Sequence, residues 1–130
     1  MYLISYFCCM KEKNDIRELY FSDGFWEFYH QQQDKVKHKF DYVIGLIRKE
    51  KVIATKFVKH LDGTDLYEMR VSVGTNEYRT VLFAVNHANI ILATKILVLN
   101  AFLKKSTKDY NKQIEKATKI LGGFKDDTIR

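Results

Sequence analysis

The chain has 130 residues, about the length of one domain, and we expect a single domain over residues 1–130. Hydrophobic residues make up 46% and charged residues 29%, so a disordered or collagen-like chain is excluded. With 22 Lys and Arg against 16 Asp and Glu, the formal net charge is +6, which indicates a polyanionic partner.

Residues 1–10 are nearly all apolar or aromatic, and they lack the basic start and the small-residue end of a signal peptide. We interpret them as a strand or as an extension upstream of the true start, with attachment to a membrane surface as the alternative. The adjacent Cys8 and Cys9 suit neither a mutual disulfide nor a zinc site, and they indicate a reducing compartment. No apolar run reaches the roughly 20 residues of a membrane span. We therefore expect a cytoplasmic protein without a membrane partner.

A strand and a helical hairpin are predicted next. Ile16–Phe21 has the pattern of a short strand, and Ser-Asp-Gly at 22–24 predicts a turn and a helix cap. Aromatic residues recur at helical spacing over 25–29, and a second amphipathic helix follows. The apolar residues of that second helix are Val36, Phe40, Val43 and Ile47. The aromatic stripe of the hairpin is expected to pack on a sheet.

From Tyr67 to Val73 the apolar period is two, which predicts a half-buried strand. A turn at 74–76 leads to a strand over Tyr78–Val85, and a turn at 86–89 leads to a central strand over Ile90–Leu99. Because short turns join these strands, antiparallel pairing is expected. A last helix is predicted over Thr107–Leu121, with an N-terminal cap at Ser106 and a glycine stop.

These elements predict an α+β fold. We expect an N-terminal strand, a helical hairpin and a C-terminal helix packed on a twisted antiparallel sheet of about four strands. A basic groove should lie on the open face of that sheet.

The positive charge falls in two blocks, residues 48–60 and 104–119, each with a net charge of +4, while the rest of the chain sums to −2. Such blocks on a slightly acidic body are typical of a surface that binds a phosphate backbone. The alternative is that the lysine stripes are only solvated faces.

Four cationic side chains are candidates for a chemical role. Arg70 and Arg79 lie on successive predicted strands, so their guanidinium groups can converge on one side of a hairpin. Lys104 and Lys105 follow the last strand, and Tyr110 opens the last helix. Converging Arg and Lys side chains bind a phosphate and stabilise negative charge that develops on it. An aromatic ring beside them can stack on an unpaired base.

Four segments of the chain resemble the RelE/HigB toxins of type II toxin–antitoxin systems, in particular their phage-derived RelE-like branch. The segments are LYEMR at 66–70, EYRTVLF at 77–83, ILVLNAFLKKSTK at 96–108 and QIEKA at 113–117. The resemblance covers about residues 56–121. It implies a RelE/ParE-like fold and a ribosome-dependent mRNA endoribonuclease that inhibits translation and uses neither metal nor cofactor. In this chemistry the 2′-OH of the substrate attacks the adjacent phosphate and leaves a 2′,3′-cyclic phosphate and a 5′-OH. The implied partners are mRNA, the ribosome and a cognate antitoxin, expected to be a helix-turn-helix protein.

The resemblance also implies residue roles. Arg70 and Arg79 would bind the scissile phosphate, Lys104 or Lys105 would protonate the leaving oxygen or neutralise the transition state, and Tyr110 would stack on the message. Further RNA contacts are expected from Lys56, Lys59, Lys95 and Lys108.

The general base stays open at this point. RelE has a lysine where this chain has Glu68, so Glu68 is either a base or a plain ion-pair partner of the arginines. His60 and His87 are alternative bases. Two other functions also stay open: a ParE-like inhibitor of DNA gyrase with the same fold, and a non-catalytic basic RNA-binding protein.

Overall fold

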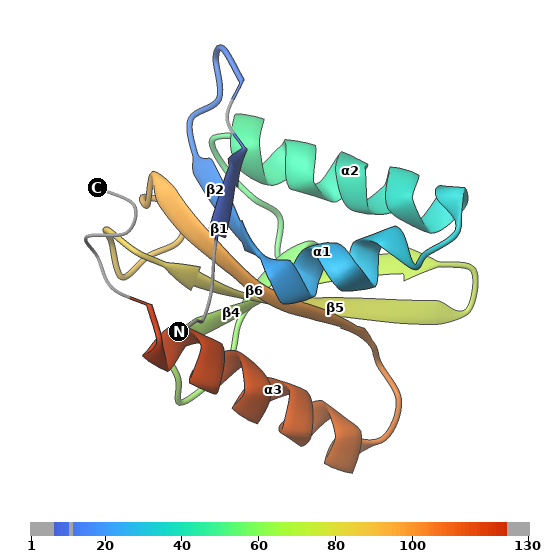
Figure 1. The fold of residues 1–130 in the computed structure, drawn as a ribbon. Helices are drawn as coiled ribbons and strands as arrows, with labels where there is room; N and C mark the ends of the chain where they lie inside the picture. Colours follow the sequence, from blue (N-terminus) through green and yellow to red (C-terminus); the bar gives the residue numbers. More distant parts are fainter. Residues whose placement is uncertain (1–6, 11, 125–130) are drawn as a thin grey trace.

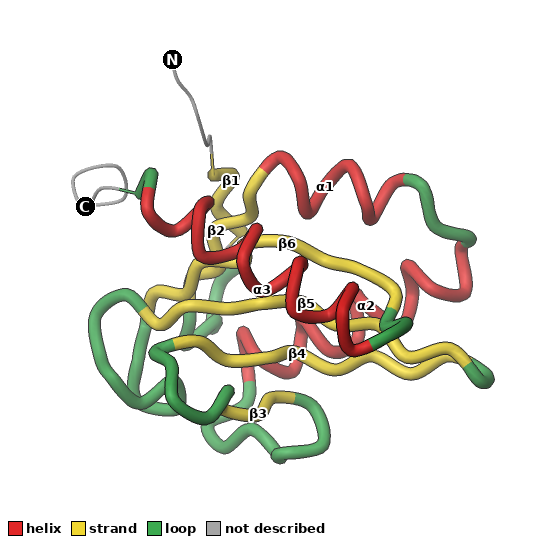
Figure 2. Tube along the Cα trace, turned by 90° about the horizontal axis from the view of Figure 1, so that it is seen from below, coloured by secondary structure: helices red, strands yellow, loops and turns green. Residues whose placement is uncertain are grey.

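The structure is a computed structural model that describes residues 7–10 and 12–124. It has the expected α+β fold in three layers, with a sheet between one pair of helices and a single helix (Figures 1 and 2). The elements in chain order are β1 Phe7–Met10, β2 Glu18–Ser22, α1 Asp23–His30, α2 Asp34–Lys49, β3 Val58–His60, β4 Leu66–Val73, β5 Asn76–Ala84, β6 Lys95–Leu103 and α3 Thr107–Gly122. Residues 1–6 of the apolar N-terminal stretch lie outside the described residues.

The sheet has six strands in the order β1-β2-β6-β5-β4-β3. Four of its five strand pairs are antiparallel, but β2 and β6 run parallel, so the wholly antiparallel expectation is wrong for this pair. The long segment between β2 and β6 contains the helical hairpin and three strands, and such a crossover is what parallel neighbours require. The edge strands β1 and β3 extend the sheet beyond the expected four strands, and β1 contains Cys9 as an exposed free thiol.

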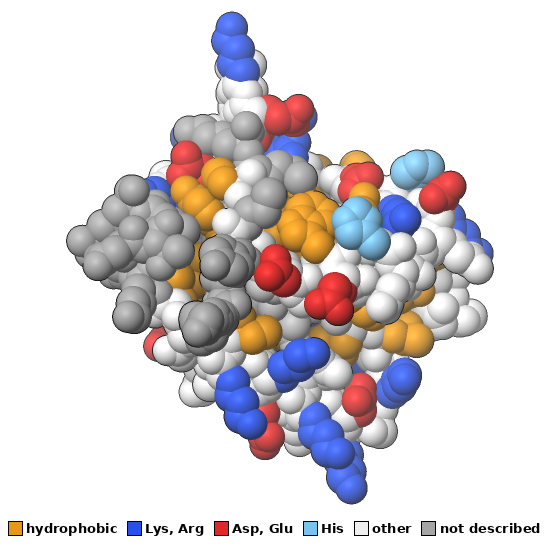
Figure 3. Space-filling model, in the orientation of Figure 1, with side chains coloured by type: hydrophobic (Ala, Val, Ile, Leu, Met, Phe, Trp, Pro, Cys, Tyr) orange, Lys and Arg blue, Asp and Glu red, His pale blue; other side chains and the backbone are white. Residues whose placement is uncertain are grey.

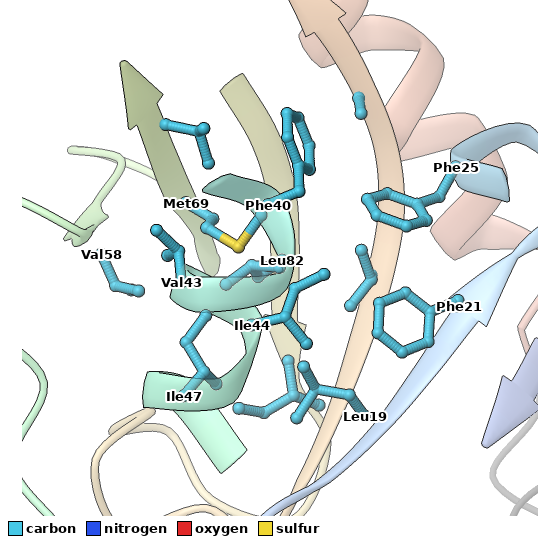
Figure 4. Packing of buried hydrophobic residues seen from close by; sticks show 14 of the residues in the cluster. Leu19, Phe21, Phe25, Phe40, Val43, Ile44, Ile47, Val58, Met69 and Leu82 are labelled. Atoms are coloured by element: carbon cyan, nitrogen blue, oxygen red, sulfur yellow. The ribbon is translucent and has the colours of Figure 1, made fainter. Parts of the chain in front are cut away.

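The main core lies between the sheet and the α1–α2 hairpin (Figure 4). Ser22 ends β2 and caps α1, because its hydroxyl accepts a hydrogen bond from the Phe25 N–H at 3.1 Å. Phe21, Phe25 and Phe40 are fully buried in this core, with the Phe21 and Phe25 rings 5.0 Å apart. Both helices and the packing of their aromatic stripe on the sheet are confirmed.

The predicted central strand begins too early. Residues 90–94 form a loop, and β6 starts only at Lys95. The Asn86 side chain holds this loop, because its Oδ1 accepts hydrogen bonds from the N–H groups of Thr94 and Lys95 at 3.0 and 3.2 Å. Ile90 and Ala93 are nevertheless buried, which explains why the sequence pattern resembled a strand.

Arg17 is a buried cation that the sequence analysis missed. Its side chain is 1% exposed, and its guanidinium makes five hydrogen bonds of 2.7–3.3 Å to backbone carbonyls. The acceptors are Ile47, Glu50, Lys51, Ile90 and Ile91. Burial lowers the pKa of Arg17 from its ordinary value. This residue therefore fastens the end of α2 to the loop that precedes β6.

Helix α3 packs on the sheet face opposite the hairpin (Figure 2). Its Ala117 is fully buried against a second, smaller core that contains Leu97 and Leu99. Ser106 caps α3 by accepting a hydrogen bond from the Asp109 N–H at 3.1 Å, as predicted. The face that was expected to be open is thus partly covered by α3. In the part of the chain that the structure describes, no helix is long and apolar enough to cross a membrane.

Candidate active site

The candidate site lies on the α3 side of the sheet, where β4 and β5 pair. Arg70 and Arg79 are direct cross-strand partners, so the predicted convergence of the two arginines is confirmed. Glu68 lies two residues before Arg70 and on the same face, since side chains alternate along a strand. Its Oε1 is 3.0 Å from Arg70 Nε and 3.3 Å from Arg79 Nε. One carboxylate therefore joins the two guanidinium groups.

Arg79 lies beneath this site and away from solvent. Its side chain is only 6% exposed and also contacts Glu77 Oε1 at 3.3 Å. An anion entering from solvent meets Arg70 first, so the expected direct contact between Arg79 and a phosphate is not available in this structure. Two acidic neighbours neutralise the buried charge, as burial of a cation requires.

Arg70 is the accessible member of the pair. Its side chain is 32% exposed, and its Nε donates to Glu68 Oε1. Among the described residues, no hydrogen bond occupies the two terminal nitrogens of Arg70. Glu68 therefore holds the guanidinium at its Nε and leaves the two terminal nitrogens available to bind an oxyanion bidentately.

Tyr110 joins α3 to the same carboxylate. Its hydroxyl donates a hydrogen bond to Glu68 Oε2, and its ring packs against Phe102 in a T-shaped contact with centroids 5.8 Å apart. Burial raises the pKa of Tyr110 above its ordinary value, and the hydrogen bond to Glu68 raises it further. Tyr110 thus stays a protonated donor at neutral pH.

A pocket of about 250 Å³ opens beside these residues. Lys104 and Lys105 line it from the β6–α3 connection, and both are exposed. The backbone N–H of Lys104 donates to Glu77 O at 2.8 Å, which fixes the start of this connection. The complete lining is Glu68, Arg70, Lys104, Lys105, Ser106, Thr107 and Tyr110. Five of these seven residues were singled out from the sequence, whereas Ser106 and Thr107 had been assigned only to the start of the helix.

Of the other predicted RNA contacts, Lys59 and Lys108 lie near the pocket. Lys59 lies opposite Glu68 in the register of β3 and β4, and Lys108 is an exposed residue in the first turn of α3. Figure 3 shows Lys and Arg side chains gathered over α3. This side of the molecule therefore offers several cations to a polyanion.

Lys56 and Lys95 lie elsewhere. Lys56 sits over the Phe57 ring, 4.9 Å from its centroid, in a hollow shared with α2 residues. Lys95 is the first of the nine residues of β6, so it lies roughly 30 Å along the strand from Lys104. Neither belongs to the candidate site.

The first basic block is also partly neutralised. Arg48 is 9% exposed and pairs with Glu12 and with Asp15, whose Oδ2 is 3.0 Å from Arg48 Nε. This residue stabilises the fold and does not contribute to a phosphate-binding surface.

The two alternative histidine bases lie outside the pocket that Glu68 lines. His60 contacts the carbonyl of Thr64 at 2.6 Å, and its ring lies against Tyr67, which faces the hairpin side of the sheet. His87 accepts a hydrogen bond from the Asn89 N–H in the loop before β6. Neither histidine lines the pocket, so the structure brings neither to the arginines.

Residues 27–121 match the family model of the phage-derived Gp49-like proteins (DUF891). The chain belongs to this family. A solved structure of the E. coli toxin RelE, a mutant in the free state, has the same fold with a TM-score of 0.54 at 12% sequence identity. That match covers 78% of this chain and 97% of RelE. A search of curated proteins gives no match. The resemblance of this Gp49-like chain to the phage-derived branch of RelE-type toxins is confirmed, as is its RelE-like fold.

The link from Tyr110 to Glu68 makes stability depend on pH. We expect Tyr110→Phe to lower the free energy of unfolding by about 1.5–3 kcal/mol at neutral pH, because it removes a hydrogen bond to a charged group. The folded-state pKa of Tyr110 is raised, so this contribution is present below the ordinary tyrosine pKa of about 10 and is lost as the pH rises through the folded value. Urea unfolding of wild type and Tyr110→Phe, repeated as the pH is raised above about 10, measures how the difference between their free energies of unfolding narrows. Tyr42→Phe, at a 54% exposed position, is the matched control. A difference between wild type and Tyr110→Phe that is independent of pH would contradict the assignment.

Proposed function

We propose that this protein is the toxin of a type II toxin–antitoxin system and cleaves mRNA on the ribosome as a metal-independent endoribonuclease. The observation that carries the proposal is the pocket in which Arg70, Lys104 and Lys105 meet on one side of the sheet. Membership of the Gp49-like family and the RelE-like fold support it. The partners that follow are mRNA, the ribosome and a cognate antitoxin.

The proposed reaction is an internal transesterification at one phosphodiester. The 2′-OH gives its proton to solvent water and its oxygen attacks the adjacent phosphorus, the bond from phosphorus to the 5′ oxygen breaks, and the leaving oxygen takes up a proton. Arg70 donates hydrogen bonds to the non-bridging oxygens as charge develops on them. Lys104 or Lys105 supplies the proton to the leaving oxygen or neutralises its charge.

Glu68 and Arg79 act through Arg70 in this proposal. Glu68 accepts from Tyr110 and holds Arg70, while Arg79 and Glu77 continue the charged row beneath the pocket. Such a row fixes the orientation of a catalytic cation before substrate arrives, which favours preorganised stabilisation of the transition state. We therefore assign Glu68 and Arg79 as positioning residues.

Removing both lysines tests the proposed chemistry. We expect Lys104→Ala/Lys105→Ala to slow mRNA cleavage in a translation extract by about 10²–10⁴-fold, the usual contribution of general acid catalysis. Primer extension locates the cuts, and enzymatic end analysis identifies the 2′,3′-cyclic phosphate. The control Lys112→Ala/Lys119→Ala removes the same charge from exposed positions of α3 outside the pocket and should cleave normally.

Other outcomes point to the alternative functions. Intact mRNA together with inhibited DNA supercoiling would replace this proposal with a ParE-like gyrase inhibitor. Salt-sensitive RNA binding without cleavage or growth arrest would replace it with a non-catalytic RNA-binding protein.

A further inference from the structure

The central strand β6 has an unpaired edge at its C-terminal half. Its pairing with β2 ends at Phe21 and Val98, because the chain turns at Ser22 into α1. Residues 100–103 of β6 therefore have β5 on one side and, among the residues that the structure describes, no strand on the other. A sheet edge of this kind presents backbone N–H and C=O groups that another strand can pair with.

The direction of these backbone groups follows from the ladder. The N–H of Lys104 donates to Glu77 O, so Lys104 faces β5. Backbone groups alternate along an antiparallel strand, hence those of Ala101 and Leu103 point away from β5. Within residues 7–10 and 12–124, no hydrogen bond occupies the outward groups of these two residues.

A cavity of about 460 Å³ lies over this edge, between α1 and α3. We call it the β6 slot. Gly24, Glu27 and Phe28 line it from α1, and Asp109, Gln113 and Lys116 line it from α3. Lys105 lines both the β6 slot and the candidate active site, so the two cavities adjoin.

A buried acceptor on the wall of the β6 slot lacks a partner. Asn100 is 2% exposed, and its Nδ2 donates to the backbone O and the Oε1 of Gln113 at 3.1 and 3.3 Å. Its Oδ1 has no hydrogen-bond partner in the described part of the chain. An unsatisfied buried acceptor of this kind costs about 1–3 kcal/mol, and this oxygen is closed to solvent in the structure.

We propose that the β6 slot binds an extended segment of a partner protein, which pairs as an added strand with Ala101 and Leu103. Such a segment would place alternate side chains toward α1 and α3. Those toward α3 would be polar, against Gln113 and Lys116, and those toward α1 would be apolar, against Phe28.

The lining favours a peptide over RNA. The outward groups of Ala101 and Leu103 repeat at the two-residue interval of a strand, which a peptide backbone matches and a nucleobase does not. Glu27 and Asp109 balance Lys105 and Lys116 around the slot, so it has no excess charge to attract phosphates. Only the identity of the partner rests on the proposed function. If the chain is a toxin, the partner is its antitoxin, and the bound segment would lie beside Lys105.

The test fills the slot from α1. A Cβ at Gly24 meets only Ser22 Oγ, at an ordinary 3.8 Å, and Gly24 lines the slot, so Gly24→Tyr is expected to place its ring in the slot. Gly45→Tyr is the matched control, since a Cβ at this α2 position meets nothing within 4 Å. Random dodecapeptides displayed on phage are selected on the wild-type chain and then synthesised. Their dissociation constants are measured for all three proteins without RNA, and thermal unfolding checks that each variant folds.

We expect Gly24→Tyr to weaken peptide binding by about tenfold or more and Gly45→Tyr to leave it unchanged. Bound peptide should slow hydrogen exchange at the amides of Ala101 and Leu103. Glu27→Tyr, from an exposed position on the same wall, replaces Gly24→Tyr should that variant not fold.

Three results would overturn the inference. The first is that no peptide is selected, and the second is that the peptides bind Gly24→Tyr as tightly as wild type. The third is that Gly24→Tyr loses the binding of a tetranucleotide RNA but keeps the binding of the peptides. The last would make the slot an RNA subsite. Peptide affinity is measured separately from cleavage. A protein that does not cleave mRNA can therefore still bind peptide in the slot, and a slot that binds no peptide leaves the nuclease proposal unaffected.

Discussion

Arg70→Ala is expected to slow mRNA cleavage by about 10²–10³-fold, the cost of removing one preorganised donor from a developing oxyanion. Arg70 is the arginine that lines the pocket with its terminal nitrogens available, while its Nε is held by Glu68. Single-turnover cleavage of a reporter mRNA on ribosomes measures the effect.

Two controls sharpen this result. Arg70→Lys keeps the charge but loses the planar fork, so it should restore only part of the rate. Arg79 still compensates Glu68 in both variants, hence thermal unfolding should change little. Cleavage by Arg70→Ala within about threefold of wild type would remove the pocket from the mechanism, because one lost hydrogen bond to a charged group costs more than that.

Arg17→Met is expected to lower the free energy of unfolding by about 3–5 kcal/mol, a range typical of breaking a buried charged network. The methionine fills the space but leaves five backbone carbonyls without their donor. Urea unfolding measures the change.

Lys51→Met is the matched control for this variant. Lys51 has an exposed side chain, and only its backbone carbonyl takes part in the network, so the change should stay within about 0.5 kcal/mol. An equally small effect of Arg17→Met would show that water replaces the guanidinium at these carbonyls.

The sequence predicted those elements whose signals are local. The helices around Phe25, Phe40 and Ala117 follow from apolar periodicity and caps, and β4 and β5 follow from alternation. The start of β6 could not be predicted in this way, because the loop before it is held by a hydrogen bond from Thr94 to the Asn86 side chain, eight residues earlier in the chain. The parallel pairing of β2 with β6 depends on the path of the whole chain between them, which no local pattern records.

At the site, alternation along the strands placed Arg70 and Arg79 together, and chain order placed Lys104 beside them. What the sequence analysis left open was how their charges are balanced. Glu68 and Arg70 are two residues apart, as are Glu77 and Arg79, so each pair shares one face of its strand. That spacing is a signal for ion pairs that the sequence analysis did not use, and only the packing of α3 shows that Arg79 is buried and Arg70 is not.

The hydrogen bonds of Arg17, which we call the clamp, hold the loop before the start of β6, whereas Lys104 and Lys105 follow the end of this strand. Folding and chemistry thus depend on opposite ends of one strand. A scan of substitutions along the chain should therefore separate into two groups: changes near the clamp that reduce the amount of protein, and changes at the pocket that leave a normally abundant but harmless product. If the proposed function holds, such a harmless, well-folded form would suit structural work on this protein.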